Sequence, residues 1–357
     1  MNFNRPITFL FLLCFAFAVL ACKKEPPVVP LLPLPSEPDT TSHTFSWTPY
    51  KFNDLGGTSY FADVAVENDT DVWAVGEVLS APDTSYNVAH WDGRNWDLGN
   101  ISVSFRGNTV SPLLDGVLVF SPTDIWVVGD LPIHGDGKNW SVYDLRSMPG
   151  FDSVSLLKAW GTSSHSIYFV GEAGSIVYFD GTSWKNQSVS SSIYLRDVWG
   201  SPDGKTVWAC GYSIDQSQSI LLKYDGTSWQ TIWSRQNQST PPYGDLVSSV
   251  WAVDSVYIAS NWGIFRDILS DGAHGTKLPP SPQHFPYRIR GTGDNNIVEA
   301  GDNGDVWHYN GADWREVNAP VPTQVFYSVA CQGNLVIAVG TDNAVFPGQA
   351  VIYMGRH

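Results

Sequence analysis

A short apolar run that ends in glycine returns along the chain. The first copy is Asp71-Val72-Trp73-Ala74-Val75-Gly76, and the fourth is Thr206-Val207-Trp208-Ala209-Cys210-Gly211. Seven copies begin at residues 71, 124, 166, 206, 255, 296 and 335, so successive starts lie 39 to 53 residues apart. Repeats of this length are typical of propellers and solenoids. The pattern therefore predicts one repeated unit rather than two unrelated domains.

A second pattern follows the first in most units and marks a turn. It is an aromatic residue, Asp-Gly, two residues and a tryptophan, as in Phe179-Asp180-Gly181-Thr182-Ser183-Trp184. Similar strings occupy residues 91–96, 135–140, 224–229 and 309–314, whereas the fifth unit keeps Asp271-Gly272 without the tryptophan. Asp-Gly between strand-like runs is a hairpin signal. With a further apolar run before each first pattern, every unit contains four short strands, A to D, as in a propeller blade.

The two ends of the repeated region complement each other. The last unit stops at Tyr353-Met354-Gly355-Arg356-His357, where strand D should follow, and Phe45-Ser46-Trp47-Thr48-Pro49-Tyr50 stands in front of the first unit. We predict that this N-terminal strand completes the last blade and closes the ring, which leaves no exposed sheet edge. The expected fold is all-β: a seven-bladed β-propeller of four-stranded blades over residues 44–357.

The composition excludes two classes of protein. The 357 residues include 16 Trp, 15 Tyr and 17 Phe, too many aromatic residues for a disordered chain. Fourteen of the tryptophans fall at repeated strand positions, where we expect them to pack between blades. The 20 Lys plus Arg and 35 Asp plus Glu give a net charge of −15, which argues against a nucleic-acid partner.

Residues 1–21 have the features of an export signal. Arg5 precedes an apolar run from Ile7 to Leu20, which is shorter than the ~20 residues of a spanning helix. Val19-Leu20-Ala21-Cys22 resembles the lipobox of bacterial lipoproteins, and the resemblance implies cleavage before Cys22 and a lipid on it. The alternatives are a conventional cleavage site nearby or a membrane anchor.

Residues 22–43 contain six prolines and are predicted to be a semi-rigid tether. The expected location is the bacterial cell envelope, as an outer-membrane lipoprotein that is periplasmic or surface-exposed and touches the membrane through its lipid alone. Cys210 and Cys331 fall in units four and seven, on nearly opposite sides of the ring. We therefore expect buried thiols and no disulfide between them.

The order of the two patterns resembles the kelch and galactose-oxidase type of propeller repeat. It departs from that type in having one glycine where kelch repeats usually have a pair. It is closer still to bacterial surface propellers with "VWAVG…DGTSW" units, a group without a common activity. The resemblance therefore implies an architecture and no reaction.

Two tryptophans, Trp233 and Trp262, fall outside the repeated positions. They lie in connections expected on one face of the ring, where they would form an aromatic platform for a sugar ring or a partner side chain. The alternative is that Trp233 continues the inward side of its strand. The polar side chains predicted to hold a ligand in the long connections of this face are Arg106, Arg235, Tyr243, His284 and Tyr287. Arg196, Arg288 and Arg290 lie in strand A runs, where they either approach the channel or pair with aspartates.

Enzyme signatures are mostly absent. The eight histidines form no close pair with metal-ligand spacing, and Asp302-Asn303-Gly304-Asp305 is a fragment of a calcium loop without the distal glutamate. We assign no catalytic residue, metal or cofactor. The leading hypothesis is a monomeric, lipid-anchored module that binds a glycan or an envelope protein. The alternative is a carbohydrate-active enzyme, a glycosidase or lyase, with its site at the mouth of the central channel.

Overall fold

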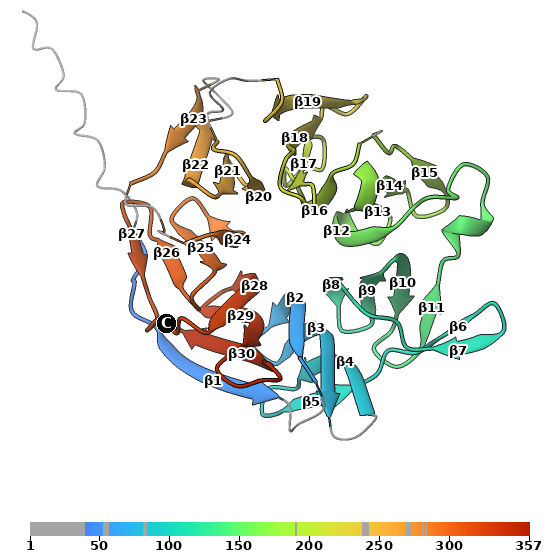
Figure 1. Cartoon of the computed structure of the whole chain (residues 1–357), viewed down its shortest axis with the longest axis horizontal. Coiled ribbons are helices and arrows are strands. Elements are labelled where there is room, and N and C mark those ends of the chain that lie inside the picture. The colour runs from blue at the N-terminus through green and yellow to red at the C-terminus, as the bar shows by residue number, and fades with distance from the viewer. Residues whose placement is uncertain are drawn as a thin grey trace, which may run out of the picture. The chain divides into compact units, whose positions relative to one another are not determined.

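The computed structural model describes residues 40–52, 57–80, 84–189, 191–237, 243–268, 273–279, 282 and 284–357. The predicted signal and most of the predicted tether lie outside these residues. From Pro38 to His357 the chain forms one compact unit. Seven four-stranded antiparallel sheets stand around a central channel in this unit, as predicted (Figure 1).

Each blade runs from an innermost strand A to an outermost strand D. Blades 1 to 3 consist of β2 (Tyr60–Asn68), β3 (Asp71–Ser80), β4 (Thr84–Trp91) and β5 (Trp96–Gly99); β8 (Gly116–Ser121), β9 (Asp124–Gly129), β10 (Leu131–Gly135) and β11 (Trp140–Val142); and β12 (Leu156–Ser163), β13 (Ser166–Gly171), β14 (Ile176–Phe179) and β15 (Trp184–Asn186). A small hairpin, β6 (Val103–Phe105) and β7 (Asn108–Val110), follows blade 1 in sequence and lies beside β11, the outer strand of blade 2 (Figure 1).

The remaining blades repeat this order. Blades 4 to 6 consist of β16 (Tyr194–Gly200), β17 (Val207–Tyr212), β18 (Ser219–Tyr224) and β19 (Trp229–Ser234); β20 (Val247–Ala252), β21 (Ser255–Ser260), β22 (Gly263–Ile268) and β23 (Ala273–Lys277); and β24 (Pro286–Gly293), β25 (Asn296–Gly301), β26 (Val306–Tyr309) and β27 (Trp314–Glu316). The helices described are two 3-10 turns, η1 (Leu145–Ser147) and η2 (Glu172–Gly174). In the part of the chain that the structure describes, no helix is long and apolar enough to cross a membrane.

The ring closes through the N-terminal strand. Blade 7 has the order β28 (Gln324–Gln332), β29 (Leu335–Asp342), β30 (Gln349–Arg356) and β1 (Ser46–Phe52). β1 pairs antiparallel with β30, from Ser46 opposite Arg356 to Phe52 opposite Ala350. Figure 1 shows the two ends of the described chain side by side in this sheet. The predicted closure is confirmed.

The repeated tryptophans pack between blades, as predicted. Trp126 of blade 2 lies 5.7 Å from Phe169 and 5.5 Å from Phe179 of blade 3, measured between ring centroids. Its indole Nε1 donates a hydrogen bond to Ser164 Oγ at 3.0 Å. The aromatic core therefore joins one blade to the next as well as filling each blade. The thiols of Cys210 and Cys331 are free, and Cys210 is buried.

The repeated glycine has a steric cause. A Cβ atom on Gly76 of β3 would overlap the carbonyl oxygen of Tyr60 in β2, because the two backbones come close there. At this point β2 carries a β-bulge, since its pairing with β3 skips Ala62. Equivalent overlaps with the neighbouring A-strand region occur at Gly129, Gly171, Gly211, Gly301 and Gly340.

Replacement of one such glycine should therefore destabilise the fold. We expect Gly340→Ala to lower the free energy of unfolding by about 1–3 kcal/mol, because the new methyl group meets the backbone of Val325 and Phe326. Gly99→Ala is the matched control, since its Cβ would meet Val88 Cγ1 at an ordinary 3.7 Å. Denaturant unfolding measures both variants, and equal stability would contradict the steric explanation.

A cluster of histidines lies where the N-terminal segment meets blades 6 and 7. His308 Nδ1 and His43 Nδ1 are 3.0 Å apart, so one nitrogen must donate and the other must accept. His43 Nε2 lies 3.0 Å from Asp313 Oδ1, and the His357 ring centroid is 5.7 Å from that of His308. Burial, followed by the neighbouring His43 and His357, lowers the pKa of His308 to about 3.

This cluster predicts a loss of stability in weak acid. The unfolded chain binds a proton at His308 below pH 6.5, whereas the folded chain binds it near pH 3, so stability falls as pH decreases below 6.5. At pH 5 this effect lowers the free energy of unfolding by about 2 kcal/mol relative to neutral pH. His308→Gln should flatten the dependence of unfolding free energy on pH between 7 and 5. His165→Gln, at an exposed histidine, should leave it unchanged.

Candidate ligand site at the mouth of the central channel

The β-bulge of strand A recurs around the channel. Strand pairing skips Ala62, Leu157, Arg196, Ser248, Tyr287 and Tyr327 in six of the A strands. The residue after each bulge is polar and buried, and we call this set the polar ring: Asp63, Lys158, Asp197, Ser249, Arg288 and Ser328. In blade 2, the pairing of Gly116 with Val128 puts Gly116 at the ring position and Asp115 at the bulge position.

Asp197 joins three blades within the polar ring. Its carboxylate accepts hydrogen bonds from Arg290 Nη2 at 2.7 Å and Nη1 at 3.0 Å, and from Ser249 Oγ. It also forms an ion pair with Arg288 Nη1. Burial raises the pKa of Asp197, but the charges of Arg288 and Arg290 outweigh it and lower the pKa to about 2. Asp197 is therefore a fully ionised group in a buried, paired network.

Asp63 forms the second ionic centre of the ring. Lys158 Nζ lies 3.1 Å from its Oδ2, and Ser328 Oγ donates to its Oδ1 at 2.6 Å. Burial lowers the pKa of Lys158 to about 8, although the nearby Asp63 carboxylate raises it in part. Burial raises the pKa of Asp63, but Lys158 and Arg288 reverse this effect and leave it below its usual range.

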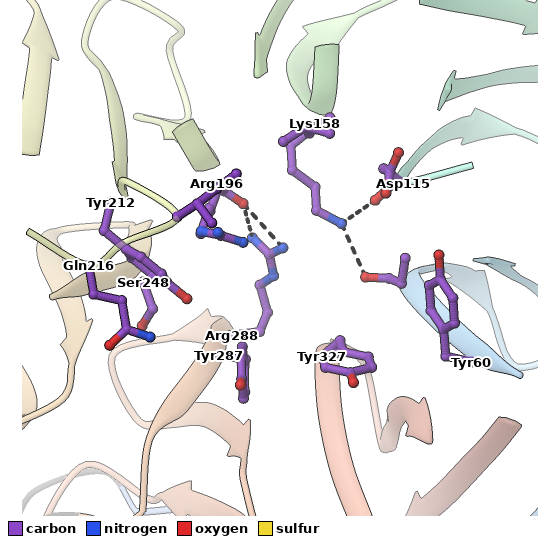
Figure 2. Close-up of a pocket in the computed structure, with 13 residues that line it drawn as sticks. Tyr60, Asp115, Lys158, Arg196, Tyr212, Gln216, Ser248, Tyr287, Arg288 and Tyr327 are labelled. Carbon is purple, nitrogen blue, oxygen red and sulfur yellow. Dashed lines mark hydrogen bonds between the residues drawn. The ribbon is translucent and has the colours of Figure 1, made fainter. Parts of the chain in front are cut away.

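A cavity of about 480 Å³ lies on one side of the polar ring. The six bulge residues and Asp115, at the equivalent position of blade 2, line it, and Lys158 and Arg288 belong to both the lining and the ring. Figure 2 shows Lys158, Arg196 and Arg288 directed into the space between the blades. Another cavity, of about 350 Å³, is lined by Asp63, Lys158, Asp197 and Arg290 together with Trp160 and Trp199. The ring therefore divides the channel.

One wall of the first cavity, which we call the channel-mouth pocket, is aromatic. Ring centroids are 6.1 Å apart for Tyr60 and Tyr327, 5.6 Å for Tyr327 and Tyr287, and 5.1 Å for Tyr287 and Phe285. Phe285 in turn lies 5.9 Å from Tyr212. Burial raises the pKa of Tyr60 to about 12, and it raises the pKa values of Tyr212, Tyr287 and Tyr327 as well. At neutral pH these phenols are protonated and can donate hydrogen bonds.

Charged side chains lie among these aromatic rings. Arg196 lies over the Tyr212 ring, with its guanidinium carbon 4.2 Å from the centroid. Asp115 lines the pocket as well, and burial raises the pKa of its carboxyl above the usual range. Lys158 Nζ donates to the carbonyl oxygens of Ala62, at 3.1 Å, and Asp115. Three cationic side chains thus face one carboxyl group, in a chain whose net charge is −15.

The predicted aromatic platform is not formed. The side chain of Trp262 is 46% exposed, but that of Trp233 is 1% exposed and packs in the core with Trp208 and Tyr243. A bulge in β19 explains this: Thr231 and Trp233 pair with successive residues of β18, and Ile232 is the extra, 39% exposed residue. Trp233 therefore points inward, as the alternative expected, but for another reason: the bulge places it on the side opposite to Thr231, which is exposed.

Two other predicted ligand residues are buried. The Tyr243 hydroxyl donates to Asp267 Oδ2 at 2.6 Å. His284 Nε2 lies 3.2 Å from Glu299 Oε1, and Nδ1 lies 2.8 Å from Asp305 Oδ2. Burial lowers the pKa of His284, but these carboxylates outweigh it and raise the pKa. Both side chains are held in internal networks rather than presented to a ligand. Among the described residues, no group of His, Cys, Asp and Glu could hold a metal ion.

Arg106 and Arg235 are more exposed but already paired. Arg106 Nε lies 2.9 Å from Asp144 Oδ2. Arg235 Nη1 donates to the carbonyl oxygen of Gln216, a residue that lines the channel-mouth pocket, at 2.5 Å. Of the seven predicted ligand residues, Tyr287 lines this pocket and the other six do not. Trp233 and Tyr243 pack together in the core, but the structure does not gather the seven into one site.

Seven of the thirteen residues that line the pocket occupy one repeated position that the sequence patterns did not reveal. The bulge residue stands 14 positions before the repeated glycine in blade 1 but 15 before it in blade 4 and 13 before it in blade 7, as shown by Ala62 and Gly76, Arg196 and Gly211, and Tyr327 and Gly340. Its side chain also has no fixed chemistry. Of the residues singled out from sequence, Tyr287 and Arg196 are bulge residues that line the pocket. Arg288, at the ring position, lines the pocket as well and pairs with Asp197.

Comparisons with known proteins support the fold. No family model matches the chain, and a search of the curated proteins finds no match. A solved structure of YCF48 bound to D1 peptide superimposes with a TM-score of 0.63 and 16% identity, over 91% of this chain and 100% of that one. The WD40 propeller domain of Doa1 has a TM-score of 0.58 and 15% identity, over 86% of this chain and 95% of that one. YCF48 from Cyanidioschyzon merolae has a TM-score of 0.57 and 16% identity, over 87% of this chain and 98% of that one. At these identities the likeness shows the propeller fold alone.

Proposed function

We propose that this chain is a protein-binding propeller of the bacterial cell envelope, held at the membrane by a lipid on Cys22. The partner would be an envelope protein that docks over the channel-mouth pocket. The proposal rests on one observation, which is the set of exposed apolar side chains around this pocket.

These apolar residues lie on connections that emerge at the same face. Ile214 is 69% exposed, lies between β17 and β18, and lines the pocket itself. Trp262 follows β21, and Val345 and Phe346 lie between β29 and β30, with Phe346 96% exposed. In an antiparallel blade, B-to-C loops and D-to-A connections share a face with the start of strand A, where the pocket lies. Exposed apolar side chains around a polar centre are typical of protein interfaces.

The comparisons are consistent with this proposal. One similar propeller has been solved with a bound peptide, so the fold can present such a site. The catalytic alternative has weaker support, because Asp115 is the one carboxylate among the residues that line the pocket, whereas most glycosidases need two. The glycan alternative is tested by a glycan array on residues 44–357.

Site-specific photo-crosslinking in cells tests the docking face. A photoreactive amino acid at Ile214 or Phe346 should capture the same partner, whereas one at Ile232, an exposed apolar residue of outer strand β19, should not. Ile214→Asp should weaken binding of the identified, purified partner at least tenfold, and Ile232→Asp should leave it unchanged. Equal capture from all three positions, or none from Ile214 and Phe346, would contradict the proposal.

Lipidation of Cys22 has a separate test. Cells grown with an alkyne-bearing fatty acid should label the wild-type protein, and Cys22→Ser should abolish the label because no thiol remains to receive the lipid. Cys14→Ser is the matched control, since that residue lies inside the predicted signal. Equal labelling of Cys22→Ser and wild type would reject the anchor.

A further inference from the structure

The channel-mouth pocket contains one cation without a counterion. Arg288 is paired with Asp197, and Lys158 with Asp63. Within the part of the chain that the structure describes, Arg196 forms no ion pair, and its buried Nε has no hydrogen-bond partner. A buried guanidinium nitrogen without a partner is costly unless a ligand supplies the acceptor.

The surroundings hold the Arg196 guanidinium in place. Its planar group lies on the Tyr212 ring and within 5.8 Å of the Tyr194 ring centroid. Arg288 donates from Nη1 and Nη2 to the Arg196 carbonyl oxygen, each at 3.4 Å, which fixes the backbone from the next wall of the pocket. An arginine positioned in this way presents its fork of donors with little further loss of side-chain entropy.

The charge balance favours a singly charged anion. The pocket and the polar ring hold four cations, Lys158, Arg196, Arg288 and Arg290, against the three carboxylates of Asp63, Asp115 and Asp197, so one positive charge remains for a ligand. A carboxylate matches the guanidinium fork and carries one charge. A phosphate carries more negative charge than the single free cation balances.

The closed floor favours the end of a chain. The ion pairs Lys158–Asp63 and Arg288–Asp197 of the polar ring link strand A of blade 3 to that of blade 1 and strand A of blade 6 to that of blade 4. They form a floor that a polypeptide entering from the mouth would meet. The volume of about 480 Å³ is that of a site for a small ligand rather than for a folded element. A terminal carboxylate can enter from the mouth with its last side chain against the tyrosine wall.

We propose that Arg196 binds the C-terminal carboxylate of a partner polypeptide, with the last residues of that partner seated against Tyr212, Tyr287 and Tyr327. This inference rests on the proposed protein-binding function and names the group that is recognised. It differs from general docking on the apolar loops because it requires a free carboxylate at the end of the bound chain.

Fluorescence anisotropy with paired peptides tests the inference on the soluble protein, residues 38–357, which is the whole compact unit. The probes are a library of N-terminally labelled hexapeptides with varied last residues, each made as the free acid and as the C-terminal amide. The best acids should bind at least tenfold more tightly than their amides. Arg196→Gln should remove this preference. Arg196→Lys, which keeps the charge without the fork, should retain part of it.

Arg106→Gln is the matched control, because it removes an equal charge from an arginine paired with Asp144 outside the pocket. It should keep the full preference for acids, and thermal unfolding should show that the Arg196 variants are folded. Equal binding of acids and amides, a preference that survives Arg196→Gln, or no binding by any peptide would overturn the inference. The crosslinking result at Ile214 would then still decide whether partners dock on this face.

Discussion

Deletion of residues 45–50 is expected to destabilise the propeller by at least about 4 kcal/mol, comparable with the loss of one large buried aromatic side chain. β1 completes blade 7 and also touches its neighbours. Trp47 Nε1 donates to the Val317 carbonyl oxygen at 2.6 Å, and the Tyr50 ring lies 5.9 Å from that of Trp91. The deletion removes these contacts and exposes the edge of β30 along its length.

Thermal unfolding of two deletions of equal length measures this effect. The variant that lacks residues 45–50 should melt roughly 8 °C below the wild type. A variant that lacks residues 30–35 of the proline-rich segment should melt with the wild type. The exposed edge should also promote self-association, which sedimentation can detect. Equal melting temperatures for the two deletions would show that closure contributes little to stability.

Asp197→Ala is expected to cost about 3–5 kcal/mol, because it leaves two buried guanidinium groups without their counterion. Arg288 and Arg290 of blade 6 both pair with this carboxylate of blade 4, and Ser249 of blade 5 donates to it. One substitution therefore removes the interaction that links blades 4, 5 and 6. Asp197→Asn should cost less, since it keeps hydrogen-bonding capacity and removes the charge.

The matched control is Asp203→Ala, which removes an aspartate of the same blade whose side chain is 55% exposed. Urea unfolding should show a change within about 0.5 kcal/mol for this variant. The pKa of about 2 for Asp197 implies that its contribution is complete above pH 3.8 and is lost as pH falls toward 2. Equal effects of Asp197→Ala and Asp203→Ala would mean that the ionic network contributes little to stability.

The strand pattern could be predicted from sequence because it depends on local, repeated chemistry. Asp-Gly pairs mark hairpin turns, and the glycine of each first pattern marks the close approach of strands A and B. The missing strand D of the last unit even predicted which segment closes the ring. Each of these signals occurs several times, so a weak copy could be identified from its stronger neighbours.

The candidate site could not be predicted in the same way. Seven of its residues, among them Ala62, Asp115, Arg196 and Tyr327, occupy equivalent positions in the blades but differ in residue type. The hairpins between strands A and B also differ in length, so the distance to the repeated glycine does not identify this position. Trp233 was misassigned as a ligand residue because a bulge in β19 reverses the direction of its side chain. A bulge cannot be recognised from the hydrophobic pattern of a strand, although it determines which side chains face the pocket.

The bulge in strand A has a consequence for how such a protein can change. The skipped residue pairs with nothing in strand B, so its side chain is not constrained by the ladder that holds the blade together. Six such positions surround one opening, and a substitution at any of them leaves the strand pairing on either side in place. The positions that face the pocket and the positions that build the strands are thus different residues of the same repeat. A propeller of this kind can therefore change its ligand by substitutions at the pocket-facing positions alone.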